Sequence, residues 1–478
     1  MENWWDTLLF AAAILLSAAV VIFLQHRKKS CGSYRVPLPL GTLGWPFIGE
    51  TIEFISCAYT DRPEKFMDKR RRLYGRVFKS HLFGSPTIVS TDAEVSRFVL
   101  QSDAKAFVPS YPKSVSELMG KSSILVINGS LHRRFHGLLG SFFKSPHLKA
   151  KITHDMQNYV KESMRNWRDD HLVYIQDEAK SIAFQVLVKA LISVDPGDDM
   201  DFLKKQFHEF IAGLMSLPIK LPGSRLHRSL QAKKKMIDLV HRIIRDKRSR
   251  DISVIPQDAV DVLLNDASEE LTDDIISGNM IDLMIPGEGS VPVLITLAVK
   301  YLSDCPSALQ QLIEENLELK RVKDLVGEQL NWNDYMSLPF TQMVITETLR
   351  MANVIVGVIK KAMKDVEIEG FLIPKGWCVL TYFRSVHFDD NLYDRPYDFN
   401  PWRWKDKEKS CNSCSFTPFG GGQRLCPGID LSRLEASIFL HHFVTQFRWV
   451  AEPDSVVHFP TVRMNKRMPV WVKRRSGT

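Results

Sequence analysis

Ten residues near the C-terminus, Phe419 to Gly428, surround a single cysteine with the sequence Phe-Gly-Gly-Gly-Gln-Arg-Leu-Cys-Pro-Gly. The glycine run that begins at Gly420 lets the backbone adopt positive φ and approach a flat ligand closely. Main-chain N–H groups can then point at the sulfur of Cys426 and tune a metal bound to it. The segment therefore predicts a loop that presents Cys426 as a thiolate ligand.

The neighbours of Cys426 suit an iron porphyrin. A thiolate ligand donates electron density to haem iron and favours cleavage of dioxygen. Arg424 carries a fork of donors that fits a haem propionate. Gly428 lets the next helix pack closely on the ring, and Phe419 shields the sulfur from water. We expect these residues and Gly420 to hold haem b, with a loop around an inert, buried cysteine as the alternative.

Two further motifs accompany the loop, which matches in full the signature Phe-x-x-Gly-x-Arg-x-Cys-x-Gly of the cytochromes P-450. Glu347-Thr-Leu-Arg350 places its two charged residues on one helix face. The segment from Phe399 to Trp404 resembles the Pro-x-Arg segment of that family. The resemblance implies that Arg403 joins the first pair in a buried structural triad.

The chain has 478 residues, of which 45% are apolar, and residues 50–478 contain no linker, repeat or low-complexity tract. Alternation over 77–90 predicts a β-hairpin, and most of 93–350 has helical periodicity. The sequence predicts further β-strands over 368–380. We therefore expect one haem-binding catalytic domain over 50–478, mainly α with small β-sheets (α+β), as in the cytochrome P-450 fold.

The N-terminus reads as a membrane anchor. Trp4 to Leu24 is an apolar run of 21 residues, and the basic stop His26-Arg-Lys-Lys29 follows it. This length predicts a transmembrane helix, and the positive-inside rule leaves the later chain in the cytosol. We expect residues 1–29 to anchor the protein, single-pass, in the endoplasmic reticulum membrane, and the proline-rich residues 30–49 to form a hinge. A cleaved signal peptide is disfavoured because no small-residue cleavage site follows.

Charge and cysteine content restrict the classes of partner and the cellular compartment that we expect. The formal net charge is +8, but the basic residues are scattered and form no basic–aromatic groove, which argues against nucleic acid. Anionic membrane lipid and an electron-donor protein are the expected acidic partners. The basic run around Lys233 is interpreted as a solvated helix face. Seven cysteines, an odd number, fit a reducing compartment, and Cys411 and Cys414 are assigned to a surface loop.

Two prolines interrupt a helical stretch over 273–302. Pro286 and Pro292 deprive carbonyls one turn earlier of their N–H partners, which predicts a polar notch. The segment resembles the Ala/Gly-Gly-x-Asp/Glu-Thr motif of the family, whose acid and alcohol relay protons during oxygen cleavage. Here Ser290 replaces the threonine and Gly289 stands in the acid position. Glu288 lies one residue early, about 100° away around a regular helix. Ser290 and Glu288 are the candidate catalytic residues.

Two further positions are compared with propionate-binding residues of the family. His132 and His136 replace the Trp-x-x-x-Arg motif, so that Arg133 or its neighbour Arg134 would have to reach the carboxylate. A neutral surface histidine pair is the alternative. Lys360 stands where many relatives place an arginine, which keeps the charge without the fork.

The chain also resembles, from residue 36 onward, plant cytochromes P-450 of brassinosteroid synthesis. The segments 111–119 and 286–292 are similar to the branch that hydroxylates the steroid side chain at C-23. This implies a monooxygenase that receives NADPH electrons through an NADPH–cytochrome reductase, since the chain contains no Gly-x-Gly-x-x-Gly fingerprint. The steroid would contact 111–119, 210–217, 284–285 and 354–358. A haem-thiolate isomerase or dehydratase and a catalytically silent steroid-binding protein are the alternatives.

Overall fold

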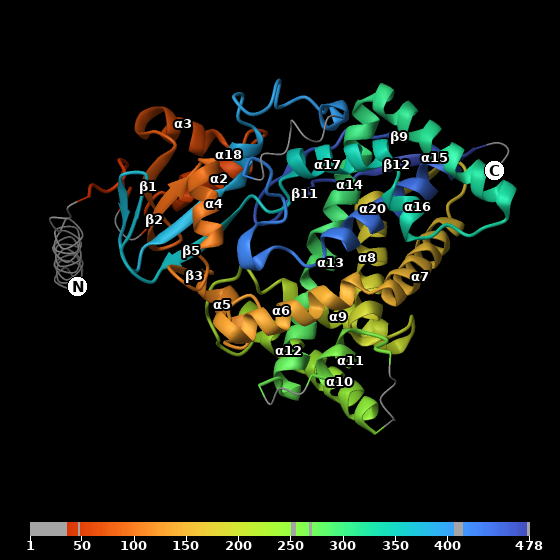
Figure 1. Cartoon of the computed structure of the whole chain (residues 1–478), viewed down its shortest axis with the longest axis horizontal. Helices are drawn as coiled ribbons and strands as arrows, with labels where there is room; N and C mark the ends of the chain where they lie inside the picture. The colour runs from red at the N-terminus through yellow and green to blue at the C-terminus, as the bar shows by residue number, and fades with distance from the viewer. Residues whose placement is uncertain (1–35, 46–47, 250–254, 267–269, 406–413, 476–478) are drawn as a thin grey trace, which may run out of the picture.

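A computed structural model describes residues 36–45, 48–249, 255–266, 270–405 and 414–475. Figure 1 shows a strand-rich part beside a larger helical part. The predicted anchor (1–29), the start of the hinge and Cys411 lie outside the described residues. Within them, one run, Asp273–Asp304, has the length and hydropathy of a membrane span, but 61% of its most apolar window is buried inside the protein.

The strand-rich part is built on a five-stranded sheet in the order β1-β2-β8-β5-β3. Only the β2–β8 pairing is parallel. Its strands are β1 (Val77–Leu82), β2 (Ser85–Ser90), β3 (Phe107–Pro109), β5 (Gly357–Ala362) and β8 (Cys378–Tyr382). The predicted hairpin is confirmed as β1 and β2. Its turn lies at Phe83 and Gly84, which both have positive φ, as a two-residue type I′ turn requires.

Smaller sheets complete the strand content. An antiparallel sheet, β4-β12-β9, brings the C-terminal segment beside the middle of the chain. Two-stranded pairs form from β6 with β7 and from β10 with β11. These strands are β4 (His171–Tyr174), β6 (Val366–Ile368), β7 (Phe371–Ile373), β9 (Phe447–Ala451), β10 (Val456–Val457), β11 (Arg463–Met464) and β12 (Pro469–Arg474).

Helices make up most of the molecule, as predicted. Many begin at a residue whose side chain caps the first turn, as Asp92 does for α4 by accepting from the amides of Glu94 and Val95. The helices of the first half are α2 (Thr51–Ala58), α3 (Lys65–Tyr74), α4 (Ala93–Gln101), α5 (Lys113–Met119), α6 (Gly129–Lys144), α7 (Pro146–Arg165), α8 (Ile175–Ile192), α9 (Asp198–Ile211), α10 (Arg225–Arg248) and α11 (Ala259–Leu264). Those of the second half are α12 (Asp273–Leu283), α13 (Ile285–Gly289), α14 (Val291–Asp304), α15 (Pro306–Val326), α16 (Trp332–Met336), α17 (Pro339–Ala352), α18 (Phe383–His387), η1 (Pro401–Trp404), η2 (Gly422–Arg424) and α20 (Ile429–Gln446).

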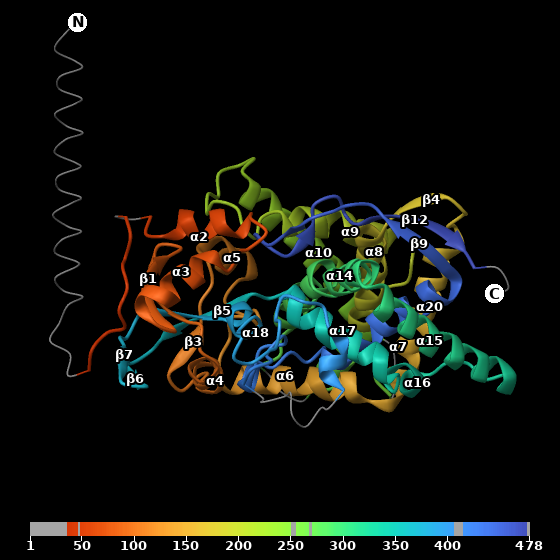
Figure 2. The ribbon, with the colours of Figure 1, turned by 90° about the horizontal axis from the view of Figure 1, so that it is seen from above.

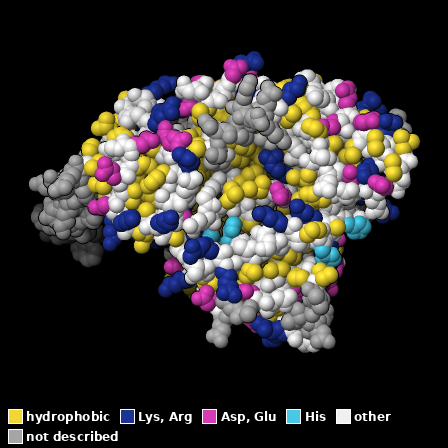
Figure 3. Space-filling view, in the orientation of Figure 1, with side chains coloured by type: hydrophobic (Ala, Val, Ile, Leu, Met, Phe, Trp, Pro, Cys, Tyr) yellow, Lys and Arg dark blue, Asp and Glu magenta, His cyan; other side chains and the backbone are white. Residues whose placement is uncertain are grey.

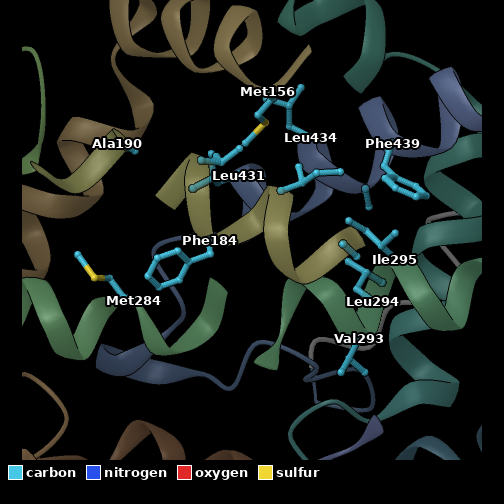
Figure 4. Close-up of a cluster of buried hydrophobic side chains, with 14 of the residues drawn as sticks. Met156, Phe184, Ala190, Met284, Val293, Leu294, Ile295, Leu431, Leu434 and Phe439 are labelled. Atoms are coloured by element: carbon cyan, nitrogen blue, oxygen red, sulfur yellow. The ribbon is translucent and has the colours of Figure 1, made fainter. Parts of the chain in front are cut away.

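The core lies where α14 passes between α8, α17 and α20, and Figure 2 shows α14 end-on near the centre of the helical part. Figure 4 shows Leu434 and Phe439 of α20 beside Leu294 and Ile295 of α14. All four side chains are buried. Burying each aliphatic or aromatic side chain contributes about 1.5–3 kcal/mol, so this packing fixes α14 against the helix that follows Cys426.

The stretch over 273–302, expected to be helical with a local distortion, is divided into three helices. The breaks fall at Met284 and Ser290, so that Pro286 and Pro292 each lie in the first turn of a new helix, where the missing N–H costs little. At the first break the amides of Met284 and Gly287 bond carbonyls three residues back. The prolines therefore begin two new helices close to the candidate catalytic residues Glu288 and Ser290.

The surface carries both signs of charge. Figure 3 shows lysine and arginine side chains interspersed with acidic and apolar ones over the face seen in Figure 1. On this face the basic side chains are therefore scattered among acidic and apolar ones.

Candidate active site

The loop around Cys426 is held by its own backbone and by α4. The Cys426 amide donates to the carbonyl of Phe419 at 3.2 Å, which closes the loop on itself. Gly420 and Gly422 have φ of 73° and 66°, conformations that favour glycine. A Cβ on Gly422 would lie 2.3 Å from the carbonyl oxygen of Leu100, so a side chain there would push the loop away from α4.

The thiol of Cys426 lies at the start of α20. Gly428 caps that helix, and a Cβ added to it would lie 3.8 Å from the sulfur. Burial raises the pKa of the Cys426 thiol, while a backbone hydrogen bond from Gly428 opposes that rise. A free thiol here would therefore be protonated near neutral pH. Binding to a metal ion removes that proton and supplies the charge that the buried thiolate needs.

The structure brings Arg424 and Lys360 together at one carboxylate that the sequence did not single out. Arg424 donates to Asp103 Oδ2 at 2.7 Å, and Lys360 donates to Asp103 Oδ1 at 2.9 Å. Asp103 is buried, and burial lowers the pKa of Lys360. Two cations share one carboxylate, so the cluster keeps an excess positive charge. That excess favours a second carboxylate, such as a haem propionate.

Arg424 also fixes the chain between α5 and α6. Its guanidinium donates to the carbonyls of Ile124 at 3.1 Å and Ile127 at 2.6 Å, and to the side chain of Asn128 at 2.8 Å. The donors expected to bind a propionate therefore also attach the loop around Cys426 to residues 124–128.

The histidines of α6 face the same loop. His136 Nε2 lies 2.8 Å from the carbonyl oxygen of Leu425, and the rings of His132 and His136 are stacked. His132 is buried, so the alternative of a surface pair is wrong for it. Burial, helped by the nearby Arg424 charge, lowers the pKa of His132 to about 4, so the ring is neutral. Arg133 is exposed and makes no ion pair within the described residues.

Arg134, the other candidate of that pair, binds elsewhere. Its guanidinium donates to both carboxylate oxygens of Asp266, at 2.7 and 2.8 Å. Of the two predicted arginines, Arg133 is therefore the one whose head group is not held by another described residue.

Glu347, Arg350 and Arg403 meet in the interior. Arg350 donates to the Glu347 carboxylate twice, at 2.9 and 2.8 Å, and Arg403 donates once at 3.0 Å. The indole N–H of Trp404 and the amide of Asn400 also donate to Glu347. Glu347 and Arg350 are wholly buried. The carboxylate therefore has five donors, which is the saturation that a buried charge requires.

Residues 287–290, which include the two candidate catalytic residues, make fewer hydrogen bonds than the network around Glu347. Glu288 binds Lys180 of α8 at 2.7 Å, and both side chains remain partly exposed. A Cβ on Gly287 would lie 3.0 Å from Leu187 Cδ2, whereas one on Gly289 would meet nothing within 4 Å. The hydroxyl of Ser290 makes no hydrogen bond to another described residue. Glu288 therefore pairs with a residue of α8. Gly289 leaves space for another group, and the Ser290 hydroxyl is available to form a hydrogen bond.

The interpretation of Lys233 as part of a solvated face is wrong. Its side chain is 9% exposed, and its ammonium donates to Asp282 Oδ1 at 2.6 Å and to the carbonyls of Leu118 and Met119. Burial raises the pKa of Asp282, and Lys233 opposes that shift. The pair joins α10 and α12 to the C-terminal end of α5, within the predicted substrate segment 111–119.

Comparisons with known proteins agree with this site. Residues 39–469 match the family described as Cytochrome P450. The 3-epi-6-deoxocathasterone 23-monooxygenase CYP90D1 of Arabidopsis thaliana is 65% identical over 456 residues, covering 94% of this chain and 92% of the relative. The enzyme of the same activity name, CYP90C1 of Arabidopsis thaliana, is 51% identical over 97% of this chain and 91% of its own length. A retinoic acid-bound cyanobacterial CYP120A1 structure has a TM-score of 0.81 and 23% identity, covering 92% of this chain and all of its own, and shows the shared fold.

The fold and the cysteine loop define a haem-thiolate protein. The chain belongs to the cytochrome P450 family and is a monooxygenase, which confirms the family and enzyme class predicted from the loop. The site fits the haem group on its own evidence, because the partly buried thiol of Cys426 has a raised pKa and needs a metal to ionise, and the Asp103 cluster has positive charge to spare.

Proposed function

We propose that the protein hydroxylates the side chain of a plant steroid, a brassinosteroid precursor, at C-23. The observation that carries the proposal is the similarity to two 23-monooxygenases, 65% and 51% identical over almost the whole chain. Electrons from NADPH reach the haem through a separate NADPH–cytochrome reductase. Haem ligated by Cys426 supplies the chemistry, which is activation of dioxygen and insertion of one oxygen atom into a C–H bond.

The residues of α13 and the following break supply protons in this proposal. Ser290 has a hydroxyl free to donate, and Gly289 leaves space for water or a substrate hydroxyl beside it. Glu288 and Lys180 form a partly exposed pair that connects this region to α8 and to solvent. We assign the final proton transfer to Ser290 with water or substrate, and assign Glu288 to the solvent end of the path.

An apolar groove at the surface offers a lipophilic substrate a place to bind. A cavity of about 630 Å³ is lined by apolar residues after α9 and by Pro460 from the β10–β11 connection. Met215 and Leu217 line it and are exposed, while Phe210 of the same predicted segment is buried. Apolar lining of this extent suits a steroid skeleton. We propose that the segment 210–217 forms the entrance for the substrate.

The same face supports membrane association. Tyr59, which follows α2, packs edge-on against Phe459, and the amide of His458 donates to the carbonyl of Ala58, so the end of α2 adjoins the β10–β11 connection. Large apolar side chains exposed on these segments and their neighbours are Trp45, Ile52, Tyr59, Leu217 and Leu221. Contiguous exposed apolar surface marks a membrane or protein contact. We propose that this face lies on the endoplasmic reticulum membrane beside the anchor formed by residues 1–29.

Incubation with a reductase tests the activity. Microsomes that contain the protein, NADPH–cytochrome reductase and NADPH should convert 3-epi-6-deoxocathasterone to a product 16 mass units heavier, about the mass of one oxygen atom. Fragmentation should place the new hydroxyl at C-23, and labelled dioxygen should supply its oxygen. Conversion without NADPH would indicate an isomerase or dehydratase, and spectral binding without product would indicate a silent steroid-binding protein.

A further inference from the structure

A polar cavity lies at the end of the molecule opposite α2, and nothing in the monooxygenase reaction uses it. It has a volume of about 450 Å³, a size typical of small-molecule sites. Its walls come from α7, α15, the segment after α15, α20 and β12, which meet on the side of the C-terminus in both Figure 1 and Figure 2. The cavity is therefore distant from the apolar face described above.

Two lysines in its lining have no counter-ion among the residues that the structure describes. Lys161 of α7 and Lys320 of α15 make no ion pair or hydrogen bond with another described residue. Lys320 is half-buried and Lys161 is exposed. Arg474, which also lines the cavity, uses its guanidinium on the carbonyls of Arg165 and Trp167 and keeps its full charge.

A buried histidine on the lining has an unused nitrogen. His442 is 6% exposed, and its Nε2 has no hydrogen-bond partner in the described part of the chain. Its other nitrogen, Nδ1, lies 3.4 Å from the side-chain amide nitrogen of Gln446. With Gln446 as the donor, the proton of the neutral ring is on Nε2. Burial above all, then the charges of His441, Lys161 and Lys320, lowers the pKa of His442 well below its usual value. The ring is therefore neutral, and its Nε2 is buried beneath the cavity lining.

The acidic residues of the lining do not neutralise these groups. Glu328 accepts from Lys323, which also binds Asp334 outside the cavity. Asp324 follows Lys320 by four residues on α15 without pairing with it, and a lysine placed before the acid is the weaker order for such a pair. The C-terminal carbonyls of α20 would also repel an anion, but Arg475 donates to those of Val444 and Phe447 and covers them.

We propose that this cavity binds a soluble, multiply charged oxyanion of the phosphate class, held by Lys161 and Lys320. Charge-assisted hydrogen bonds from two ammonium groups suit phosphate oxygens. The position of the cavity, at the end opposite the apolar face, favours a ligand from the aqueous phase over a lipid headgroup. The site is independent of the haem reaction.

Calorimetric titration of the holoenzyme with inorganic pyrophosphate, at constant ionic strength in chloride, tests the proposal. We expect saturable binding of one pyrophosphate and a rise in the midpoint of thermal unfolding. Lys320→Met should weaken binding at least tenfold, because one charge-assisted bond is lost. Lys235→Met removes an equal charge from the exposed side of α10 and should leave the affinity unchanged.

Asp324→Asn should change the affinity for pyrophosphate in the opposite direction to Lys320→Met. A folding defect alone could not explain such a gain in affinity. Removing that carboxylate from the lining should tighten pyrophosphate binding about twofold or more, since like-charge repulsion is relieved. No saturable binding, or equal binding by wild type and Lys320→Met, would overturn the assignment. Binding to vesicles that contain phosphatidylinositol phosphate, with none to pyrophosphate, would also overturn it by showing a lipid headgroup as the ligand.

Discussion

Polar groups on the two sides of the proposed haem site differ in how completely they are hydrogen-bonded. On the side of the cysteine loop, Glu347 accepts from Arg350, Arg403, Trp404 and the amide of Asn400 in a sealed network. On the oxygen side, the helix is broken twice around α13, and the hydroxyl of Ser290 has no bond to a described residue. Saturated groups hold one geometry, whereas unsaturated groups are available to water and substrate. The contrast separates structural from reactive polar residues.

The largest expected effect comes from opening the sealed network. Arg350→Ala leaves Glu347 as a buried charge with fewer donors, which destabilises the protein by about 3–5 kcal/mol. We expect little folded, haem-containing protein, measured as the haem absorbance per mole of purified chain. Arg321→Ala is the matched control, because Arg321 binds Glu318 with the same three-residue spacing and the same two nitrogens, but on the surface. If the two variants lose haem equally, the network is not the structural element inferred here.

Breaking the buried Lys233–Asp282 pair should cost less. Lys233→Met leaves Asp282 without its cation, but the raised pKa of Asp282 allows it to become neutral. We expect a loss of about 2–3 kcal/mol in the free energy of unfolding, at the lower end of buried-pair values. Lys233→Met combined with Asp282→Leu should recover part of it. Denaturant unfolding measures both, with Lys235→Met as the exposed control, and an unchanged midpoint in Lys233→Met would contradict the pairing.

The sealed side also predicts a pH dependence of stability. His387 accepts from the amide of Thr417 and bonds Asn353, and burial above all lowers its pKa to about 3. The unfolded chain takes up this proton near pH 6.5, whereas the folded chain does so only near pH 3. The contribution is therefore complete above pH 6.5 and is lost as pH falls toward 3, by about 1.4 kcal/mol per unit. Unfolding at pH 7.5 and 5.5 should show this slope, and it should be smaller in His387→Gln.

The supply of protons on the oxygen side is tested by the amount of product formed per NADPH consumed. Gly289 has room for a side chain, so Gly289→Asp can supply the missing acid without a clash. In our proposal the substrate carries a side-chain hydroxyl next to the target carbon, and this hydroxyl completes the path that delivers protons. We expect product per NADPH to fall severalfold for a substrate analogue that lacks it, and to rise again in Gly289→Asp. Product and NADPH consumption are measured together. Equal coupling of both substrates in the wild type would exclude a role for the substrate hydroxyl.

The smallest effect is expected for Glu288. Its carboxylate is committed to Lys180, so Glu288→Gln should lower turnover only about twofold while leaving coupling unchanged. Lys180→Met is the companion variant and should behave alike. A dead Glu288→Gln enzyme would make Glu288 the proton donor itself and would contradict its placement at the solvent end.

Local features of the site could be read from the sequence, and remote pairings could not. The hairpin and the Glu347–Arg350 pair depend on residues within a few positions of each other, so spacing alone predicts them. Asp103 meets Arg424 across 321 residues, and Glu288 meets Lys180 across 108. No pattern around these acids distinguishes them from surface residues.

Lys233 shows a signal that was present but overlooked. On α10 the buried residues Leu226, Ser229, Lys233, Met236 and Val240 recur every three or four positions, so Lys233 lies in the buried stripe. A lysine on such a stripe requires a buried acid, and Asp282 provides it. The basic run around it hid this periodicity, because Lys234 and Lys235 are exposed.

The central claim is that the sulfur of Cys426 binds the haem iron as a thiolate and that the reaction depends on this ligand. The spectrum of the reduced protein with carbon monoxide tests the claim most directly. The wild-type protein should show the red-shifted absorption band of thiolate-ligated haem, and Cys414→Ser should keep it. Cys426→Ser should lose that band along with all product formation. A thiolate band that survives in Cys426→Ser, or disappears in Cys414→Ser, would contradict the account.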